Sequence, residues 1–412
     1  MTADTRVSRA TSRIFSLLRK DRQKLPRDIK VMLAAAFLIA LGFGLVAPVL
    51  PQFATTFGVG NTEASVIVAI FAFMRLVFAP AGGALIGRLG ERPVYVTGLL
   101  IVAASTAACA FAQDYWQLLL FRGLGGAGSV MFTVASMALV VRLAPPESRG
   151  RVSGAYASAF LIGNVCGPIV GGLLAGFGLR VPFLAYAAAL VVAAVVVQTQ
   201  LSHQRRGSGP QQDRADMPLA EALAAGTYRT ALVSSFVNGW ATFGVRMATV
   251  PLFAVAALGA GPEAAGFALA VFAAGNAAAL TFSGRLADTL GRKPMMVAGL
   301  LVAGASTAAI GFTTGLGWFL AASALAGVGS GLFGPAQQAA VADVIGNGRS
   351  GGKVLAVYQM TSDVGAIVGP VLAGVLADRL GYGWAFGVTG GVMVVAACTW
   401  LAARESLRKP AA

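Results

Sequence analysis

Long apolar segments recur along the whole chain and restrict its fold more than any other feature. A run of about 20 apolar residues is long enough for a helix to cross a bilayer, and only helices and closed barrels satisfy every backbone polar group there. Only 11% of the 412 residues are charged, against about 25% in a soluble domain. The sequence therefore predicts an all-α integral membrane protein with 12 transmembrane helices. The predicted spans are 31–51, 64–86, 94–112, 116–141, 152–175, 183–200, 231–256, 264–286, 295–313, 317–342, 354–377 and 384–402.

One long polar segment, 201–229, separates six spans from the other six. We therefore expect two pseudo-symmetric six-helix bundles, 31–200 and 230–403, joined by a linker on the same side as both chain ends. A basic N-terminal segment, 1–30, precedes the first bundle, and a short tail, 404–412, follows the second.

The formal net charge of +15 is distributed unevenly between the two sides of the predicted membrane. With the N-terminus in the cytoplasm, 26 of the 31 lysines and arginines fall in cytoplasmic segments, and only Arg180 and Arg379 fall outside. Positively charged loops mark the cytoplasmic side of membrane proteins. The sequence thus predicts a multi-pass protein of the plasma (inner) membrane with both termini in the cytoplasm. The orientation of the chain in the lipid bilayer explains its positive net charge, and no nucleic-acid partner is expected.

Residues that form most catalytic or metal sites are scarce in this chain. The single histidine, His203, lies in the polar linker, and Cys109, Cys166 and Cys398 are isolated in apolar runs. Such a set predicts neither a zinc site nor a histidine-based triad. We expect no enzyme activity, no cofactor and no metal.

The two halves of the chain repeat each other at an offset of 200 to 202 residues. Two parallel repeats are typical of transporters whose halves rock about a substrate site near the middle of the membrane. The repeat therefore predicts a central cavity and transport by alternating access. Among the matches, Phe43-Gly44 recurs as Phe243-Gly244, Gly83 as Gly284, and Gly163-x-x-x-Gly167-Pro168 as Gly365-x-x-x-Gly369-Pro370.

Four ionisable residues are predicted at membrane depth: Asp363, Arg75, Arg122 and Arg246. Such groups are costly in lipid and usually mark a functional site. Because Asp363 is the only carboxylate at that depth, we expect it to carry the proton of a coupled transport cycle, with Arg246 as its partner. Desolvation favours the protonated acid and a nearby guanidinium favours the carboxylate. A substrate that disturbs the pair would then drive proton exchange.

The central cavity is expected to combine charged, polar and adaptable apolar side chains. Arg75 and Arg246 lie several turns from either end of their helices, and the repeat aligns Arg75 with Asn276. Methionine and aromatic surfaces suit varied amphipathic ligands. A structural ion pair and ordinary helix packing are the alternative interpretations of these residues. The predicted cavity residues are Arg75, Asn276, Arg246, Phe243, Trp240 and Met74.

Motifs at the helix ends and in two spans carry a family resemblance. They are Gly83-Ala-Leu-Ile-Gly87-Arg88-Leu-Gly90-Glu91-Arg92-Pro93, its second copy Gly284-Arg-Leu-Ala-Asp288-Thr-Leu-Gly291-Arg292-Lys293-Pro294, the segment around Arg122, and Gly163-Asn-Val-Cys-Gly167-Pro168-Ile-Val-Gly171-Gly172. At these residues the chain resembles the major facilitator superfamily (MFS), and within it the twelve-helix drug:proton antiporters that include tetracycline exporters. The resemblance covers residues 31–403.

The resemblance implies that these motifs control gating and proton coupling. Small residues let helix ends approach each other, and paired acids and arginines form a latch that breaks and remakes between two states. Gly87 stands where the family has an acidic residue, so Asp288 is expected to carry more of this work. The resemblance also implies that Arg122 belongs with Asp363 and Arg246 in the proton-coupling set. The implied gating residues are Gly83, Arg88, Gly90, Arg92, Asp288, Arg292, Gly163, Gly167, Pro168, Gly171 and Gly172.

The leading interpretation is a monomeric, proton-coupled exporter of small amphipathic compounds, including drugs and antibiotics. The alternative is a transporter of an anionic metabolite or lipid, with Arg75, Arg122 and Arg246 as anion-binding groups. A membrane-embedded enzyme lacks clustered histidines or paired carboxylates at membrane depth and a phosphate-binding loop. A receptor or fixed scaffold stays open, although the repeat around charged residues favours two moving halves.

Overall fold

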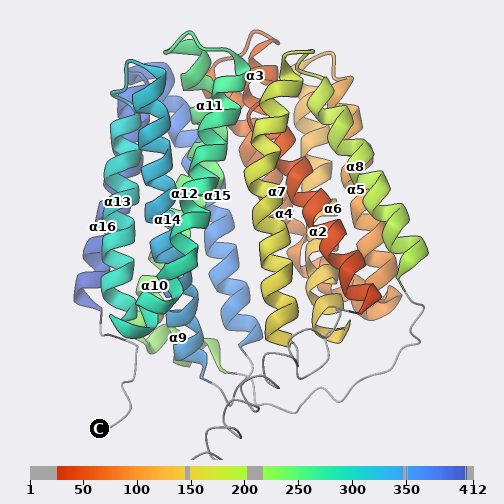
Figure 1. The fold of residues 1–412 in the computed structure, drawn as a ribbon, viewed down its shortest axis with the longest axis vertical. Coiled ribbons are helices and arrows are strands. Elements are labelled where there is room, and N and C mark those ends of the chain that lie inside the picture. Colours follow the sequence, from red (N-terminus) through yellow and green to blue (C-terminus); the bar gives the residue numbers. More distant parts are fainter. Residues whose placement is uncertain are drawn as a thin grey trace, which may run out of the picture.

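The computed structural model describes residues 26–143, 149–201, 217–346, 349, 351–403 and 405. The predicted basic segment 1–30 and the tail 404–412 therefore fall largely outside the described residues, as do residues 202–216 of the predicted linker 201–229. Within the described part of the chain, 12 helices are long and apolar enough to cross a membrane. They run roughly side by side in one bundle (Figure 1). The prediction of an all-α membrane protein with 12 spans is confirmed.

The first half of the chain supplies six spans, and in the first of them α2 is continued by the short helix α3. The helices are α2 (Arg27–Val46), α3 (Leu50–Thr55), α4 (Asn61–Leu89), α5 (Glu91–Ala110), α6 (Tyr115–Leu143), α7 (Arg149–Ala175) and α8 (Val181–Gln200). Several helices extend beyond the apolar windows, because their charged and capping residues continue the same helix.

The second half supplies the other six, after the short helix α9 (Leu219–Ala224). Its first span is built from α10 (Gly226–Asn238), the π-helix η2 (Gly239–Val245) and α11 (Arg246–Ala256). The remaining helices are α12 (Pro262–Thr289), α13 (Arg292–Ile310), α14 (Leu316–Ile345), α15 (Gly352–Leu380) and α16 (Tyr382–Ala402).

Two hydrophobic cores divide the molecule into two six-helix bundles. One core is built almost entirely from the first half and the other from the second half. In the first bundle α2 packs on α7 and α8, and α5 packs on α6 and α8. In the second, α15 packs on α10 and η2, and α13 packs on α14 and α16. These pairs correspond under the sequence repeat, so the predicted pseudo-symmetric bundles are confirmed.

The two bundles meet along two seams that the repeat also relates. One seam joins α4 to α15, and the other joins α7 to α12. We call the face where α2 begins and α16 ends the inner face, and the opposite face the outer face. In Figure 1, α3 and α11 lie near the outer face and α9 lies at the inner face.

The seams are closed at the outer face and the bundles separate toward the inner face. Thr62 at the start of α4 lies against Gly374 near the end of α15, and Gly172 near the end of α7 lies against Gly266 of α12. Nearer the inner ends, Phe78 of α4 and Met360 of α15 are 40% and 41% exposed, and the ribbons diverge (Figure 1). The two halves are therefore in contact at the outer face and further apart toward the inner face, an arrangement that we call inward-open.

Candidate functional site

Arg75 and Asp363 face each other across the α4/α15 seam, one from each half of the protein. The Arg75 Nε and Asp363 Oδ1 atoms are 4.0 Å apart, and the two side chains are 25% and 15% exposed. Arg75 Nη1 donates a hydrogen bond to Ser129 Oγ (3.2 Å), and Gln359 Nε2 donates one to Asp363 Oδ1 (3.5 Å). The site is thus a partly exposed ion pair that joins the halves, with one polar neighbour for each charge.

The expected pairing of Asp363 with Arg246 differs from the structure. Arg246 is only 4% exposed, and its guanidinium carbon lies 3.7 Å from the centre of the Phe272 ring. The reason is helix register, because Gly239 packs directly on the backbone of Ser362. Arg246 follows Gly239 by seven residues, which places it about 10 Å further along its helix than the level of Asp363.

A second arginine is held in the same manner in the first half. The Arg122 guanidinium carbon lies 4.1 Å from the centre of the Phe71 ring. Phe71 and Phe272 correspond at the repeat offset of 201 residues, so each half uses the same ring position to hold a buried cation. Sequence reasoning missed Phe272, although the repeat offset from Phe71 would have found it.

Each of the two buried arginines has at least one side-chain N–H group that finds no hydrogen-bond acceptor among the described residues. Within the described part of the chain, Arg246 Nε and Nη1 and Arg122 Nε are buried and have no hydrogen-bond partner. A buried donor without a partner is unfavourable. Among the described arginines and lysines, Arg246 is therefore the one that an additional hydrogen-bond acceptor would stabilise most.

The other predicted cavity residues lie in different surroundings. Trp240 is buried in the core of the second half, where its Nε1 donates a hydrogen bond to Thr389 Oγ1 (3.2 Å). Met74 packs against Gly126 of α6. Phe243 is 50% exposed, and Asn276 is half-buried on α12.

Glycines of α7 let this helix approach two neighbours closely. A Cβ atom added to Gly163, Gly167 or Gly171 would stand within 2.8 Å of the α2 backbone, and at Gly171 it would lie 2.3 Å from the carbonyl oxygen of Leu45. Gly172 faces the other way, toward α12. The glycines therefore fix α7 between its own bundle and the second seam, which is physically what small residues do at helix crossings.

The predicted gating loops at the inner face make ionic contacts within their own halves. In the first copy, Arg142 pairs with Glu91 (2.9 Å) and Arg92 donates a hydrogen bond to the carbonyl oxygen of Gln198. Gly83 lies inside α4 and Arg88 in its last turn. The chain then turns at Gly90, whose φ of +88° favours glycine.

The second copy forms a tighter ionic cluster. Arg292 pairs with Asp288 and, at 3.4 Å, with Asp343. Glu405 accepts hydrogen bonds from the backbone nitrogens of Arg292 (2.9 Å) and Lys293 (3.0 Å). Asp288 is thus engaged with an arginine of its own half in this inward-open arrangement.

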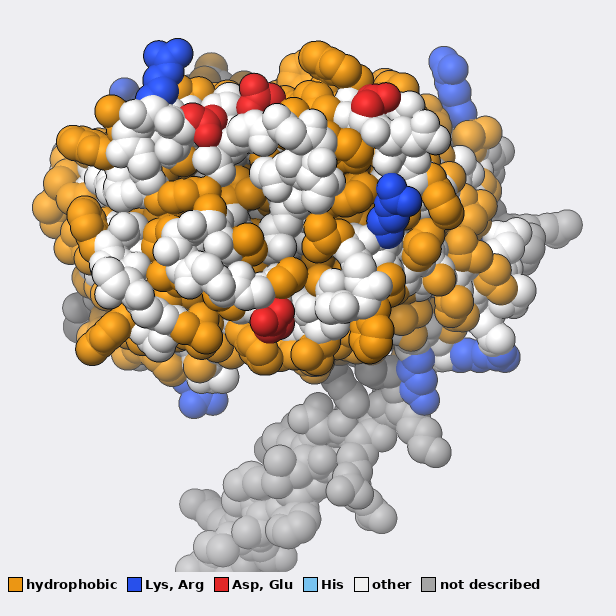
Figure 2. Space-filling view, turned by 90° about the horizontal axis from the view of Figure 1, so that it is seen from above, with side chains coloured by type: hydrophobic (Ala, Val, Ile, Leu, Met, Phe, Trp, Pro, Cys, Tyr) orange, Lys and Arg blue, Asp and Glu red, His pale blue; other side chains and the backbone are white. Residues whose placement is uncertain are grey.

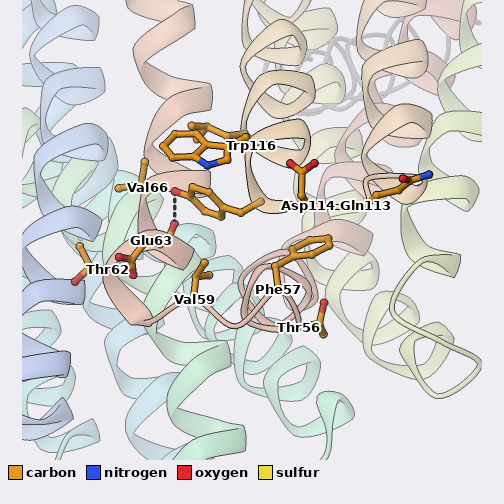
Figure 3. A pocket seen from close by; sticks show the side chains of 11 residues that line it. Thr56, Phe57, Val59, Thr62, Glu63, Val66, Gln113, Asp114 and Trp116 are labelled. Atoms are coloured by element: carbon orange, nitrogen blue, oxygen red, sulfur yellow. Dashed lines mark hydrogen bonds between the residues drawn. The ribbon is translucent and has the colours of Figure 1, made fainter.

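A groove of about 950 Å³ opens at the outer face between the start of α4 and the start of α6 (Figure 3). Tyr115 donates a hydrogen bond to the backbone oxygen of Glu63 (3.1 Å) across it. Its two carboxylates already cap their own helices, since Glu63 accepts from the nitrogen of Gly60 and Asp114 from that of Gln117. Acidic side chains are scattered among apolar ones over this face (Figure 2). The groove is therefore a weaker candidate than the Arg75–Asp363 pair.

Twelve spans in two repeated six-helix bundles, with a charged pair between them, match the architecture of membrane transporters built from parallel repeats. A family model described as Major Facilitator Superfamily matches residues 32–256 and 231–412. The chain belongs to this superfamily.

Among characterised proteins, the chain is similar to multidrug resistance protein 2 of Bacillus subtilis (strain 168). The two are 28% identical over 378 residues, which cover 89% of this chain and 92% of the relative. It is also similar to the quinolone resistance protein NorA of Staphylococcus aureus, at 30% identity over 182 residues, or 44% of this chain and 47% of NorA. The protein is thus an MFS transporter whose relatives include a multidrug resistance protein and a quinolone resistance protein.

Solved structures show the same fold at low sequence identity. A bacterial homolog of the human lysosomal transporter Spinster, inward-facing and unoccupied, has a TM-score of 0.76 at 19% identity, over 92% of this chain and 96% of that one. A D-xylose-proton symporter has a TM-score of 0.74 at 17% identity, over 92% and 99%.

Proposed function

We propose that this protein exports small amphipathic compounds in exchange for protons, by alternating access. The Arg75–Asp363 pair carries the proposal, because it is an ionisable contact at membrane depth between the two halves that must move. Names of relatives, multidrug resistance protein 2 and a quinolone resistance protein, support a drug-like substrate. The concentration of lysine and arginine on the inner side supports a plasma (inner) membrane protein with both termini in the cytoplasm, and we expect a monomer.

Protonation of Asp363 is the proposed coupling step. In the proposed cycle the Asp363 carboxylate is ionised in the inward-open arrangement, where Arg75 Nε lies 4.0 Å from its Oδ1. A proton that reaches Asp363 from outside, in the outward-open arrangement, removes the charge of the carboxylate and so removes the partner of Arg75. Release of this proton to the cytoplasm restores the pair. Because an ionised carboxylate at this depth is unfavourable without its cation, the protonation state and the arrangement of the halves are linked.

Arg75 is also placed to sense the substrate. Its side chain is a quarter exposed and has a second partner in Ser129. An amphipathic compound that enters from the inner face would contact exposed apolar side chains such as Phe78 and Met360 before it reaches the pair. Competition between substrate and Arg75 for Asp363 is the proposed basis of exchange.

A second candidate is a transporter of anionic compounds. The observation that favours it is the buried Arg246, whose Nε and Nη1 have no partner among the described residues. In this alternative an anionic group of the substrate would reach Arg246 in another arrangement of the halves. The substrate would then be selected by negative charge.

Proteoliposomes with an internal pH-sensitive dye distinguish the two candidates. We expect an organic cation such as ethidium to cause proton movement that depends on transporter concentration, while Asp114→Asn, an acid that caps only its own helix, behaves as wild type. Proton movement only with anionic dyes, lost in Arg246→Met, would favour the second candidate. No substrate-dependent proton movement with either class would contradict proton coupling.

A further inference from the structure

Asp378, at the outer end of α15, caps the first turn of α4 in the opposite half of the protein. Its Oδ1 accepts hydrogen bonds from the backbone nitrogen (3.0 Å) and Nδ2 (2.8 Å) of Asn61. Its Oδ2 accepts from the backbone nitrogen (2.8 Å) and Oγ1 (2.6 Å) of Thr62. A carboxylate at a helix N-terminus is favourable, because the first backbone nitrogens have no partner within the helix and the helix dipole is positive there.

The same two helix ends are held by further contacts across the seam. Tyr382, at the start of α16, donates a hydrogen bond to Asn61 Oδ1 (2.7 Å). Gly374, one turn before Asp378, lies so close to Asn61 and Thr62 that an added Cβ would come within 2.8 Å of their backbone. Asn61 is therefore held by two polar side chains of the other half. We call Asp378, Tyr382, Asn61 and Thr62 the outer clamp.

The repeat does not reproduce the outer clamp in the second seam. At the repeat offsets, Asp378 corresponds to Gly176, which has no carboxylate, and Thr62 corresponds to Pro262, which has no backbone N–H to donate. There the halves meet through Gly172 against Glu263 and Gly266. The corresponding residues of the α7/α12 seam therefore cannot form the same carboxylate cap. Among the described residues, the side-chain hydrogen bonds between the halves at the outer face lie at the α4/α15 end, in the outer clamp.

We propose that Asp378 is a positioning residue of the transport cycle: the outer clamp holds the outer face closed and must open before the protein can face outward. The proposal rests on alternating access as the proposed function. The α4 and α15 ends cannot separate while four hydrogen bonds join Asp378 to Asn61 and Thr62. Asp378 thus sets the population of the inward-open state, without contact to substrate or to Asp363.

Distances between spin labels on the two halves test this proposal directly. Gln113 and Thr314 are exposed, repeat-equivalent positions in outer loops of different halves, and both can be replaced by labelled cysteine after the three native cysteines are changed to serine. In lipid nanodiscs without substrate or pH gradient, we expect Asp378→Ala to raise the ratio of long to short outer distances about tenfold over wild type. Thr62→Val, which removes one of the donors, should give a smaller increase in the same direction.

Control variants distinguish an effect of losing the outer clamp from misfolding and from loss of transport. Asp114→Asn removes an outer carboxylate that caps only its own helix, so its distance distribution should equal that of wild type. In flux measurements Asp378→Ala should raise the KM for substrate from the inner side, because fewer molecules are inward-open. Asp378→Glu keeps a carboxylate and should bring the KM part of the way back to the wild-type value. If Asp378→Ala does not fold, Asp378→Asn takes its place.

An unchanged distance distribution in folded Asp378→Ala and Asp378→Asn would overturn the outer clamp. The spin-label measurement requires neither substrate nor protons. Absence of proton-driven flux in the wild-type protein would therefore contradict the proposed function while leaving the outer clamp to be judged by the distances alone.

Discussion

Arg75 of α4 and Asp363 of α15 lie 4.0 Å apart across the seam between the two halves. The antiparallel register of α4 and α15 places Asn61 beside Asp378, Ser65 beside Gly374, and then Arg75 beside Asp363. The 14 residues from Asn61 to Arg75 correspond to about 21 Å of helix, within a hydrocarbon core of about 30 Å. The pair is therefore closed off from the outer face and partly exposed toward the inner one.

The pairing itself can be measured with a double-mutant cycle. We expect Arg75→Gln and Asp363→Asn to be coupled by about 0.5–3 kcal/mol in the free energy of unfolding, because each removes the other's partner. Arg246→Gln and Asp363→Asn should be additive within about 0.5 kcal/mol. Unfolding in mixed detergent micelles provides the measurement. Strong coupling of Asp363 to Arg246 and none to Arg75 would contradict the assigned partner.

Arg246 should contribute little to stability despite its burial. Its described contact is the Phe272 ring, worth about 0.5–2 kcal/mol, and this is offset by two buried donors without partners. We expect Arg246→Met to change the free energy of unfolding by less than about 1 kcal/mol. The matched control is Arg292→Met, which removes contacts to Asp288 and Asp343 and should cost about 1–3 kcal/mol. A larger loss for Arg246→Met than for Arg292→Met would show that Arg246 has partners of greater strength.

The close packing of α7 on α2 predicts opposite effects of two glycine substitutions. A Cβ at Gly171 would lie 2.3 Å from the carbonyl oxygen of Leu45, whereas Gly87 in α4 has nothing within 4 Å. Gly171→Ala should lower the free energy of unfolding by about 1–3 kcal/mol through overpacking. Gly87→Ala should raise it by about 0.5–1 kcal/mol, because alanine favours a helix over glycine. Thermal and denaturant unfolding of the two variants check this contrast, and equal effects would rule out the packing argument.

The fold could be predicted from the sequence, because the features that cause it are present in the sequence itself. Apolar runs of membrane length and the repeat at offsets of 200 to 202 residues predicted 12 spans and two related bundles. The break in the seventh span was not predicted. The π-helix at Gly239–Val245 arises where Gly239 packs on Ser362 of α15, and such tertiary packing leaves no periodic signal in one sequence.

Only part of the candidate site could be predicted from the sequence, since hydropathy gives the depth of a charged residue in the membrane but not the direction in which its side chain points. Arg75, Arg246 and Asp363 were identified as deep residues, but the partner of Asp363 was wrong. The outer clamp was not predicted, because in the sequence Asp378 looks like any other acidic residue near the end of a helix. A helix N-terminus in the other half satisfies it, and only the arrangement of the two halves brings them together.

Transport by the Asp363→Asn variant in proteoliposomes tests the central claim, that Asp363 carries the coupled proton. The account predicts that this variant loses at least about 90% of substrate movement driven by a pH gradient, yet still exchanges labelled for unlabelled substrate at equal pH, because a neutral side chain cannot release a proton but leaves the substrate path in place. Asp114→Asn serves as the control acid and should retain both activities. Full pH-driven transport by Asp363→Asn would contradict the account.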